Sequence, residues 1–253
     1  MGHVLRQIRF TNKAFWRNPA SAFFTFAFPL LFLVIFTTLI GNDDVLLASG
    51  ETIKSSTYYV FSMAAFGLIS ACYTNIAISV VFAREEGVLK RVRGTPMSAG
   101  AYLAARVAHS ALVGFLLVAI TVVFGVVVYQ AHFPSGLDVV YFLISLVVGA
   151  GCFASIGLAV SGIVPNADAG PPIINAVMLP LLFLSGVFLT IPLDAPSWLL
   201  WIGRIFPVRH LVDAMQNSYL GLPFRWSDVA VMAAWTIGAG VVATRTFRWE
   251  PSR

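Results

Sequence analysis

The densest run of charged residues in the sequence, residues 84–96, has the spacing of a docking element. Val88, Leu89 and Val92 form a narrow apolar stripe at helical spacing, and the basic residues of the run are displaced from it. This pattern predicts a short helix of two or three turns. A rigid basic projection of that kind suits a groove on a soluble partner, although a solvated loop that only fixes the orientation in a membrane fits the same residues.

Boundary signals follow this predicted helix. Gly94 and Pro96 are typical of a helix end, and Ser98 is expected to cap the start of the next helix. The run is therefore expected to be a short helix joined closely to longer elements on both sides.

Residues suited to acid–base catalysis are scarce. His210 and Asp213 are the only pair of that kind, and they would serve a membrane-embedded enzyme such as a lipid-modifying transferase. The sequence contains no H-E-x-x-H or G-x-S-x-G motif, and Cys72 and Cys152 both fall in apolar stretches, so we expect no catalytic constellation and no metal site. It also contains no G-x-x-x-x-G-K-[ST] phosphate loop, so we expect ATP and Mg²⁺ to bind a different polypeptide and no cofactor to bind this chain.

The elements that must position these residues are long apolar blocks. Hydrophobic residues make up 58% of the chain and charged residues 11%, against roughly 25% charged residues in a soluble domain. A helix needs roughly 20 apolar residues to cross a bilayer, and only helices can satisfy the backbone in blocks of this length. The sequence predicts an all-α polytopic membrane protein, one domain over residues 1–253, whose first block is retained rather than cleaved as a signal peptide. The six predicted membrane helices are residues 22–40, 57–82, 103–129, 139–164, 172–191 and 229–244.

Basic residues are unevenly distributed between the two ends of these helices. Short loops rich in Lys and Arg stay in the cytoplasm. With the N-terminus inside, 12 Lys and Arg fall on the cytoplasmic side, and the 4 outside are Lys54, Arg204, Arg209 and Arg225. We therefore expect a multi-pass protein of the plasma (inner) membrane with both termini in the cytoplasm. Nucleic acid is not expected as a partner, because the charges sit in short loops between apolar blocks.

Residues 3–17 show an amphipathic pattern at helical period. Val4, Ile8 and Phe15 fall on one face, and the opposite face is basic. Such a helix is expected to lie in the inner interface against anionic lipid headgroups. It could act as a lever between a cytoplasmic partner and the first membrane helix, or as a passive anchor. The residues of its basic face are Arg6, Arg9, Lys13 and Arg17.

The stretch 192–228 is too polar to cross a membrane, yet it carries bulky apolar residues such as Trp198 and Trp201. It could form a pair of short helices that dip into the outer leaflet, with breaks at Pro207 and Gly221. An ordinary external cap with tryptophans at the membrane interface fits the same composition.

Few polar residues lie inside the apolar blocks. His109, near the cytoplasmic start of the third helix, is expected to be a hydrogen-bonded interfacial residue, and no proton relay is indicated, so the energy source should lie outside the chain. Asn75 and Asn175 could line a substrate pathway or hydrogen-bond between helices. Gly151 and Ala159 belong to a row of small residues that predicts close packing of the fourth helix.

These motifs resemble those of the membrane subunits of type 2 ABC exporters, a family that includes antibiotic and daunorubicin-type efflux permeases. In that family the loop between the second and third helices is a coupling helix that contacts the ATPase subunit, and the fifth helix precedes an external re-entrant hairpin. The fifth-helix pattern here is residues 180–188, followed by Pro192, Trp198, Pro207, His210 and Gly221. The residues that match the coupling loop are Glu86, Gly87, Leu89, Lys90, Arg91, Thr95 and Pro96, and Arg84 and Glu85 directly before them are counted with it.

The resemblance implies an ATP-driven exporter of an amphipathic, drug-like or lipid-like substrate. Two copies of a separate ABC ATPase subunit would hold ATP and Mg²⁺, and a second permease subunit, either the same chain or a paralogue, would form the pathway with this one. Residues 3–17 would then be the connecting helix of the family. A lipid-modifying enzyme and an ATP-independent channel or scramblase are the alternatives, and a stable complex with a separate P-loop ATPase would favour the exporter over both.

Overall fold

A computed structural model describes residues 2–47, 50–94, 97–131, 133–191 and 195–247. Within these residues, five helices are long and apolar enough to cross a membrane, with mean hydropathies of 1.4 to 2.9. They confirm five of the six predicted blocks, and the chain is an all-α multi-pass membrane protein. Four of them are α2 (Pro19–Ile40), α6 (Ala99–Tyr129), α7 (Leu137–Ile163) and α11 (Trp226–Thr246). The fifth is a continuous helix made of α3 (Ser55–Ile69), the π-helical turn η1 (Ser70–Thr74) and α4 (Asn75–Glu85).

The remaining predicted block forms a shorter helix than the sequence indicated. α8 runs from Gly170 to Leu184, whereas the prediction extended to residue 191. Its 15 residues are about 22 Å long, short of a hydrocarbon core of roughly 30 Å. The helix stops because the chain turns at Gly186, whose φ of +78° is left-handed, and the Tyr58 hydroxyl donates to the Gly186 carbonyl there.

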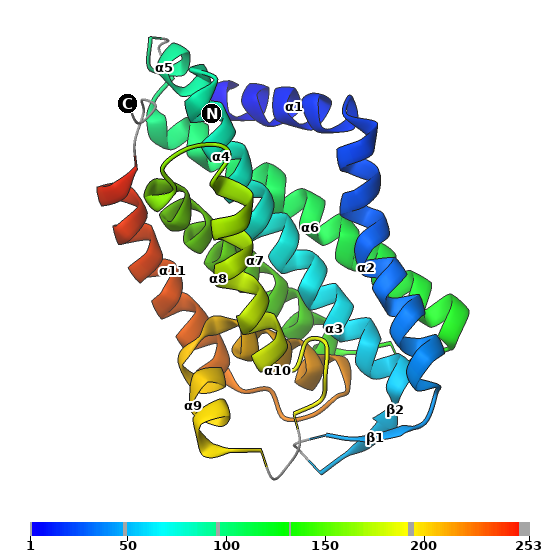
Figure 1. Cartoon of the computed structure of the whole chain (residues 1–253). Coiled ribbons are helices and arrows are strands. Elements are labelled where there is room, and N and C mark those ends of the chain that lie inside the picture. Colours follow the sequence, from blue (N-terminus) through cyan, green and yellow to red (C-terminus); the bar gives the residue numbers. More distant parts are fainter. Residues whose placement is uncertain (1, 48–49, 95–96, 132, 192–194, 248–253) are drawn as a thin grey trace.

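α7 is the central helix of the bundle. It contacts α11, α10, α6, α3, η1 and α4, and the long helices run side by side around it (Figure 1). At one end of the bundle lie α1 (Gly2–Trp16) and α5 (Val88–Arg93), and α11 ends on the same side. We call this the α5 end. The opposite end carries two short strands and two short helices, and we call it the hairpin end.

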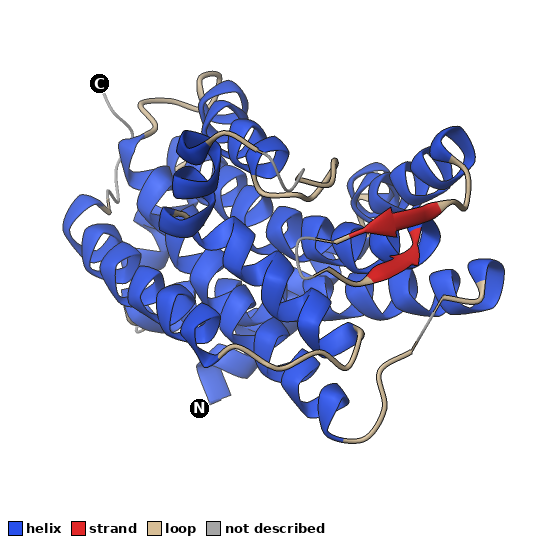
Figure 2. Ribbon diagram, turned by 90° about the horizontal axis from the view of Figure 1, so that it is seen from below, coloured by secondary structure: helices blue, strands red, loops and turns tan. Residues whose placement is uncertain are grey.

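The strands of the hairpin end were not predicted. β1 (Asp44–Leu46) and β2 (Thr52–Lys54) pair antiparallel, with Val45 opposite Ile53, and Figure 2 shows them beside the helices of this end. An exposed ion pair at 2.8 Å joins Lys54 Nζ to Asp44 Oδ1. The segment is too short for a hydropathy pattern to separate a hairpin from a loop.

The short helices of the hairpin end are α9 (Ser197–Ile205) and α10 (Pro207–Tyr219). They match the predicted pair with its break at Pro207, the first residue of α10. After α10 the chain turns at Gly221, whose φ is +69°. The beginning of the predicted region, Pro192, lies outside the described residues.

Close packing of α7 occurs at only some of the small residues that were expected. A Cβ added to Gly157 would lie 2.7 Å from the carbonyl oxygen of Tyr73, whereas nothing described lies within 4 Å of a Cβ added to Gly151. Ala159 packs as predicted, against Ala239 and Ala243 of α11. α7 therefore packs closely against neighbouring helices at Gly157 and Ala159, whereas the space beside Gly151 is open.

Candidate functional site

The predicted docking element is a short helix entered through a left-handed glycine. α4 ends at Glu85, Gly87 has a φ of +67°, and α5 occupies Val88–Arg93. Gly94 follows as the last capping residue. Because a left-handed conformation costs most L-residues about 1 to 2 kcal/mol, the sharp turn between α4 and α5 requires glycine. The predicted residues Thr95 and Pro96 lie outside the described residues.

α5 has one buried face and one exposed charged face. Leu89 is completely buried and anchors the helix, with Val88 and Val92 partly buried beside it. Lys90 and Arg91 are exposed, and the Arg91 guanidinium donates to the Glu86 carbonyl at 3.2 Å. Exposed Lys90 and Arg91 of α5 lie beside exposed Glu86, the residue directly after α4. We refer to these three residues as the α5 charged face.

Arg84 does not belong to this exposed face. Its side chain is 1% exposed, and it donates to the carbonyl oxygens of Ser161 at 3.2 Å and Val164 at 2.6 Å. Both acceptors lie at the C-terminal end of α7, where the carbonyl groups lack helical partners and attract a cation. Arg84 Nε lies 3.6 Å from Glu85 Oε1. The sequence grouped Arg84 with residues that contact a partner, whereas the fold turns it inward as a cap for α7.

Ser98 caps the start of α6, as predicted, close to this site. The Ser98 hydroxyl accepts a hydrogen bond from the Ala101 backbone at 3.3 Å at the start of α6. α5 therefore lies between the turn at Gly87 and the capped start of α6. It is joined in this way to two long apolar helices, the one that ends in α4 and α6.

α1 is amphipathic in the predicted sense. Val4, Ile8 and Phe15 are partly buried, and α1 packs against α6, where the Phe15 ring contacts His109 edge to face at 5.7 Å. The four basic residues Arg6, Arg9, Lys13 and Arg17 are exposed. The expectation for His109 was wrong, because this side chain is 4% exposed and its Nε2 has no hydrogen-bond partner among the described residues.

The two asparagines predicted for a pathway lie apart. Asn75 is partly buried and lines a groove of about 500 Å³ between α2 and the η1 region, whereas Asn175 is exposed on α8 and does not line this groove. Hydroxyl groups of Ser70 and Thr74 share the groove with aromatic rings such as Phe28. The π-helical turn η1 places these polar groups along one side, and such turns occur frequently at functional sites.

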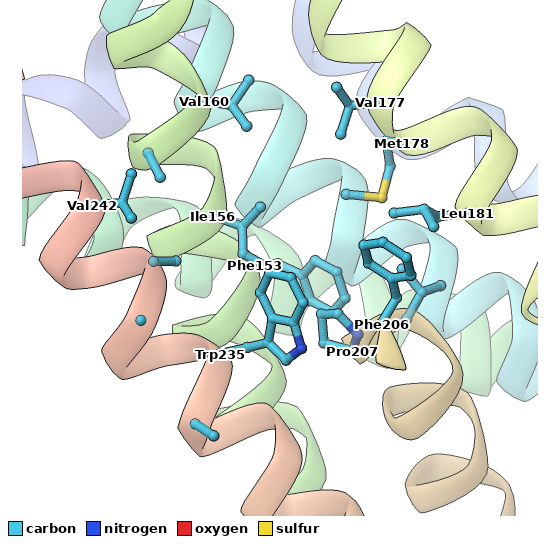
Figure 3. A pocket seen from close by; sticks show the side chains of 15 residues that line it. Phe153, Ile156, Val160, Val177, Met178, Leu181, Phe206, Pro207, Trp235 and Val242 are labelled. Atoms are coloured by element: carbon cyan, nitrogen blue, oxygen red, sulfur yellow. The ribbon is translucent and has the colours of Figure 1, made fainter. Parts of the chain in front are cut away.

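A second, more apolar groove lies between α7, α8 and α11. It has a volume of about 540 Å³, and Figure 3 shows Ile156, Met178 and Leu181 lining it. Trp235 stacks on Phe206 at 5.8 Å and donates from Nε1 to the Ile205 carbonyl at 2.9 Å, which secures the end of α9. Sequence periodicity did not reveal this groove, because its walls come from separate helices.

The candidate acid–base pair is not a pair. His210 Nδ1 lies 2.6 Å from Asp228 Oδ1 and its Nε2 lies 3.0 Å from the Arg204 carbonyl, whereas Asp213 pairs with Arg209 at 2.9 Å. The hydrogen bond to Asp228 raises the pKa of His210. Burial raises the pKa of Asp213 in spite of the opposing Arg209. Among the described residues there is also no group of three His, Cys, Asp or Glu that could hold a metal ion.

Comparison with known proteins places most of the chain in one family. A family model described as ABC-2 type transporter matches residues 5–220. The inner membrane transport permease YadH of Escherichia coli strain K12 is 24% identical over 196 residues, which cover 76% of this chain and 72% of YadH. The daunorubicin resistance ABC transporter permease protein DrrB1 of Streptomyces coeruleorubidus is 26% identical over 235 residues, which cover 91% of this chain and 78% of DrrB1.

A third relative is a longer protein. The probable multidrug ABC transporter permease YbhR of Escherichia coli strain K12 is 24% identical over 175 residues, 68% of this chain. The match covers 47% of YbhR, so the chain spans about half the length of that relative.

Proposed function

Because the chain belongs to the ABC-2 type transporter family, as a membrane permease subunit, we propose that it moves an amphipathic, drug-like or lipid-like substrate outward with energy from ATP. The observation that carries this proposal is the α5 charged face. It consists of exposed Lys90 and Arg91 on α5 and of exposed Glu86 just before this helix. Leu89 of α5 is completely buried, and the ends of α5 join two membrane helices. Displacement of such a helix by a partner would move both of those membrane helices.

The ATPase is a separate chain in this proposal. Two ABC ATPase subunits bind ATP and Mg²⁺ and dock on α5, whose exposed residues offer both signs of charge to a groove. The proposed coupling segment consists of Glu85, Glu86, Gly87, Leu89, Lys90, Arg91, Thr95 and Pro96. Buried Leu89 anchors this segment, and Arg84 supports it from inside the bundle. α1 acts as the connecting helix, because its basic face is free while its apolar face packs on α6.

The α5 end faces the cytoplasm of a bacterial inner membrane in this proposal. The basic residues of α1 and of residues 84–94 gather at that end, as the positive-inside rule requires. Although α8 alone is too short to cross, we propose that α8 and the apolar residues 185–191 after it together complete a sixth crossing, and that α9 and α10 form an external re-entrant pair. The exposed Trp198 and Trp201 of α9 suit the outer membrane interface, where tryptophan is enriched.

The substrate pathway that we propose includes the groove beside η1. Hydroxyl and amide groups from Ser70, Thr74 and Asn75 face aromatic rings there, a combination that suits an amphipathic molecule with a few hydrogen-bonding groups. A second permease subunit, either a copy of this chain or a paralogue, closes the open side of the pathway and contributes the facing wall. Asn175, exposed on α8 and outside this groove, is proposed to line a separate part of the pathway.

The proposal is tested by co-purification. The chain should form a stable complex with a separate P-loop ATPase, and ATP hydrolysis by that ATPase should depend on this subunit. A lipid-modifying enzyme or an ATP-independent channel would instead retain its activity without any ATPase. Native mass measurement of the purified complex gives the number of permease and ATPase subunits.

A further inference from the structure

A polar pocket at the hairpin end is separate from the α5 charged face and from both membrane grooves. It has a volume of about 320 Å³, within the range of small-molecule sites. Its polar lining residues come from the segment before β2, from α10 and from the connection between α10 and α11. The six polar lining residues are Glu51, Arg209, Asp213, Gln216, Asn217 and Arg225.

Two buried amides face this pocket without a protein partner. Gln216 is 9% exposed and Asn217 is 8% exposed. Neither side chain makes a hydrogen bond to any described residue, although both residues line the pocket. The amide groups of both side chains are open to the pocket, so they are available to hydrogen-bond a polar molecule that enters it.

The charges of the pocket are balanced. Arg209 and Asp213 form an ion pair within α10 at 2.9 Å. Arg225 and Glu51 are exposed at the lining, and neither has an ion-pair partner in the described part of the chain. The pocket thus offers one unpaired cation, one unpaired anion and two amides, so it suits a ligand with both a negative and a positive group.

We propose that this pocket binds a phosphoethanolamine-type zwitterion. A phosphate accepts hydrogen bonds at several oxygens, which matches the donors of Arg225, Asn217 and Gln216. The primary ammonium is placed toward the carboxylate of Glu51, the anion of the pocket that has no ion-pair partner among the described residues. No aromatic residue is among those that line the pocket, so it lacks the cage that quaternary ammonium groups favour.

The pocket walls are fixed by backbone hydrogen bonds. The Leu47 amide donates to the Glu51 carbonyl at 2.8 Å, and the Leu222 amide donates to the Asn217 carbonyl at 2.8 Å. Glu51 and the turn directly beyond α10 are therefore held in place by hydrogen bonds of their own backbone. The site is independent of ATP-driven export, and its test contains neither an ATPase nor nucleotide.

The direct test uses the full chain in nanodiscs of phosphatidylcholine and titrates it with glycerophosphoethanolamine by calorimetry. We expect saturable binding, weakened about ten-fold or more in Asn217→Leu and Arg225→Gln. Leucine has the same branching at Cγ as asparagine and lacks the amide, and the thermal unfolding midpoint will report whether the variant keeps its fold. Lys54→Gln, at the same end but outside the pocket, is the control and should bind as the wild type does.

Two further titrations define the ligand and its source. Glycerophosphoglycerol, which has the phosphate but no ammonium, should bind at least ten-fold more weakly. Equal binding of both compounds would show a simple anion site and would overturn the zwitterion proposal. The proposal would also be overturned if no saturable binding were found, or if both variants bound as the wild type does. In nanodiscs of phosphatidylethanolamine, loss of glycerophosphoethanolamine binding would identify the lipid headgroup as the natural source, and retained binding would identify a free molecule.

Discussion

Arg84 Nη2 lies 2.6 Å from the carbonyl oxygen of Val164, so the last turn of α4 caps the end of α7. This contact joins the helix that leads into α5 to the central helix of the bundle. Two hydrogen bonds from the terminal nitrogens and the carboxylate of Glu85, 3.6 Å from Arg84 Nε, compensate for the burial of this charge. In the proposed mechanism, a movement of α5 therefore reaches α7 directly.

Replacing Arg84 should destabilise the protein. Arg84→Gln leaves the carbonyl groups of Ser161 and Val164 without the forked donor, and we expect the free energy of unfolding to fall by about 1 to 3 kcal/mol. Unfolding in mixed micelles measures this change. Lys90→Gln is the matched control, because Lys90 is exposed. Equal stability of the two variants would show that the cap contributes nothing.

Replacing Gly87 should affect coupling through the backbone. Nothing described lies within 4 Å of a Cβ added there, so the cost of Gly87→Ala is the left-handed conformation alone, about 1 to 2 kcal/mol. We expect this variant to reposition α5 and to lower transport per ATP hydrolysed. Gly87→Asn should retain more coupling, because asparagine tolerates this conformation better. Identical coupling ratios for wild type, Ala and Asn would contradict the role given to this turn.

Small residues on α7 should differ sharply in their tolerance to substitution. A Cβ at Gly157 would meet the Tyr73 carbonyl oxygen at 2.7 Å, so Gly157→Ala should cost about 1 to 3 kcal/mol in unfolding free energy. Gly151→Ala, on the same helix with open space, is the control and should be close to neutral. The prediction fails if both alanine variants unfold at the same denaturant concentration.

The contacts of His210 predict a pH dependence at the hairpin end. Both ring nitrogens face acceptors, Asp228 Oδ1 and the Arg204 carbonyl, so both hydrogen bonds form only when the imidazole is protonated. The folded-state pKa is raised, so this stabilisation is fully present below the unfolded value of about 6.5 and is lost as pH rises through the raised value.

Thermal unfolding between pH 6 and pH 9 measures this effect. We expect the midpoint of the wild type to fall toward high pH and that of His210→Gln to vary less. The other charged groups around His210 are Asp213, Asp228, Arg204 and Arg209. The arginines stay charged over this range, and a slope that survives in His210→Gln would assign the effect to another group.

The long helices follow from composition because each is an unbroken apolar run. The end of α8 cannot be predicted from composition, because the residues after Leu184 are as apolar as those before it. Val187 and Phe188 are buried, so the sequence pattern there looks like that of a continuing helix. Only the turn at Gly186, with its hydrogen bond from Tyr58, explains the stop, and these two residues are far apart in the sequence.

The residues of the candidate site differ in how well the sequence defines them. Exposed Lys90 and Arg91 could be predicted from their displacement off an apolar stripe. The inward direction of Arg84 could not, because a basic residue directly after an apolar block looks like any loop charge until the end of α7 is placed beside it. The His210–Asp228 contact likewise depends on the packing of α10 against α11.

The central claim is that α5 binds the partner ATPase, and its most direct test is the affinity of the reconstituted subunits. The double variant Lys90→Glu, Arg91→Glu reverses the exposed basic charge of α5 without touching buried Leu89. We predict at least a ten-fold weaker complex with the ATPase, while Lys54→Glu at the hairpin end leaves the affinity unchanged. An affinity for the α5 variant equal to that of the wild type would contradict the account.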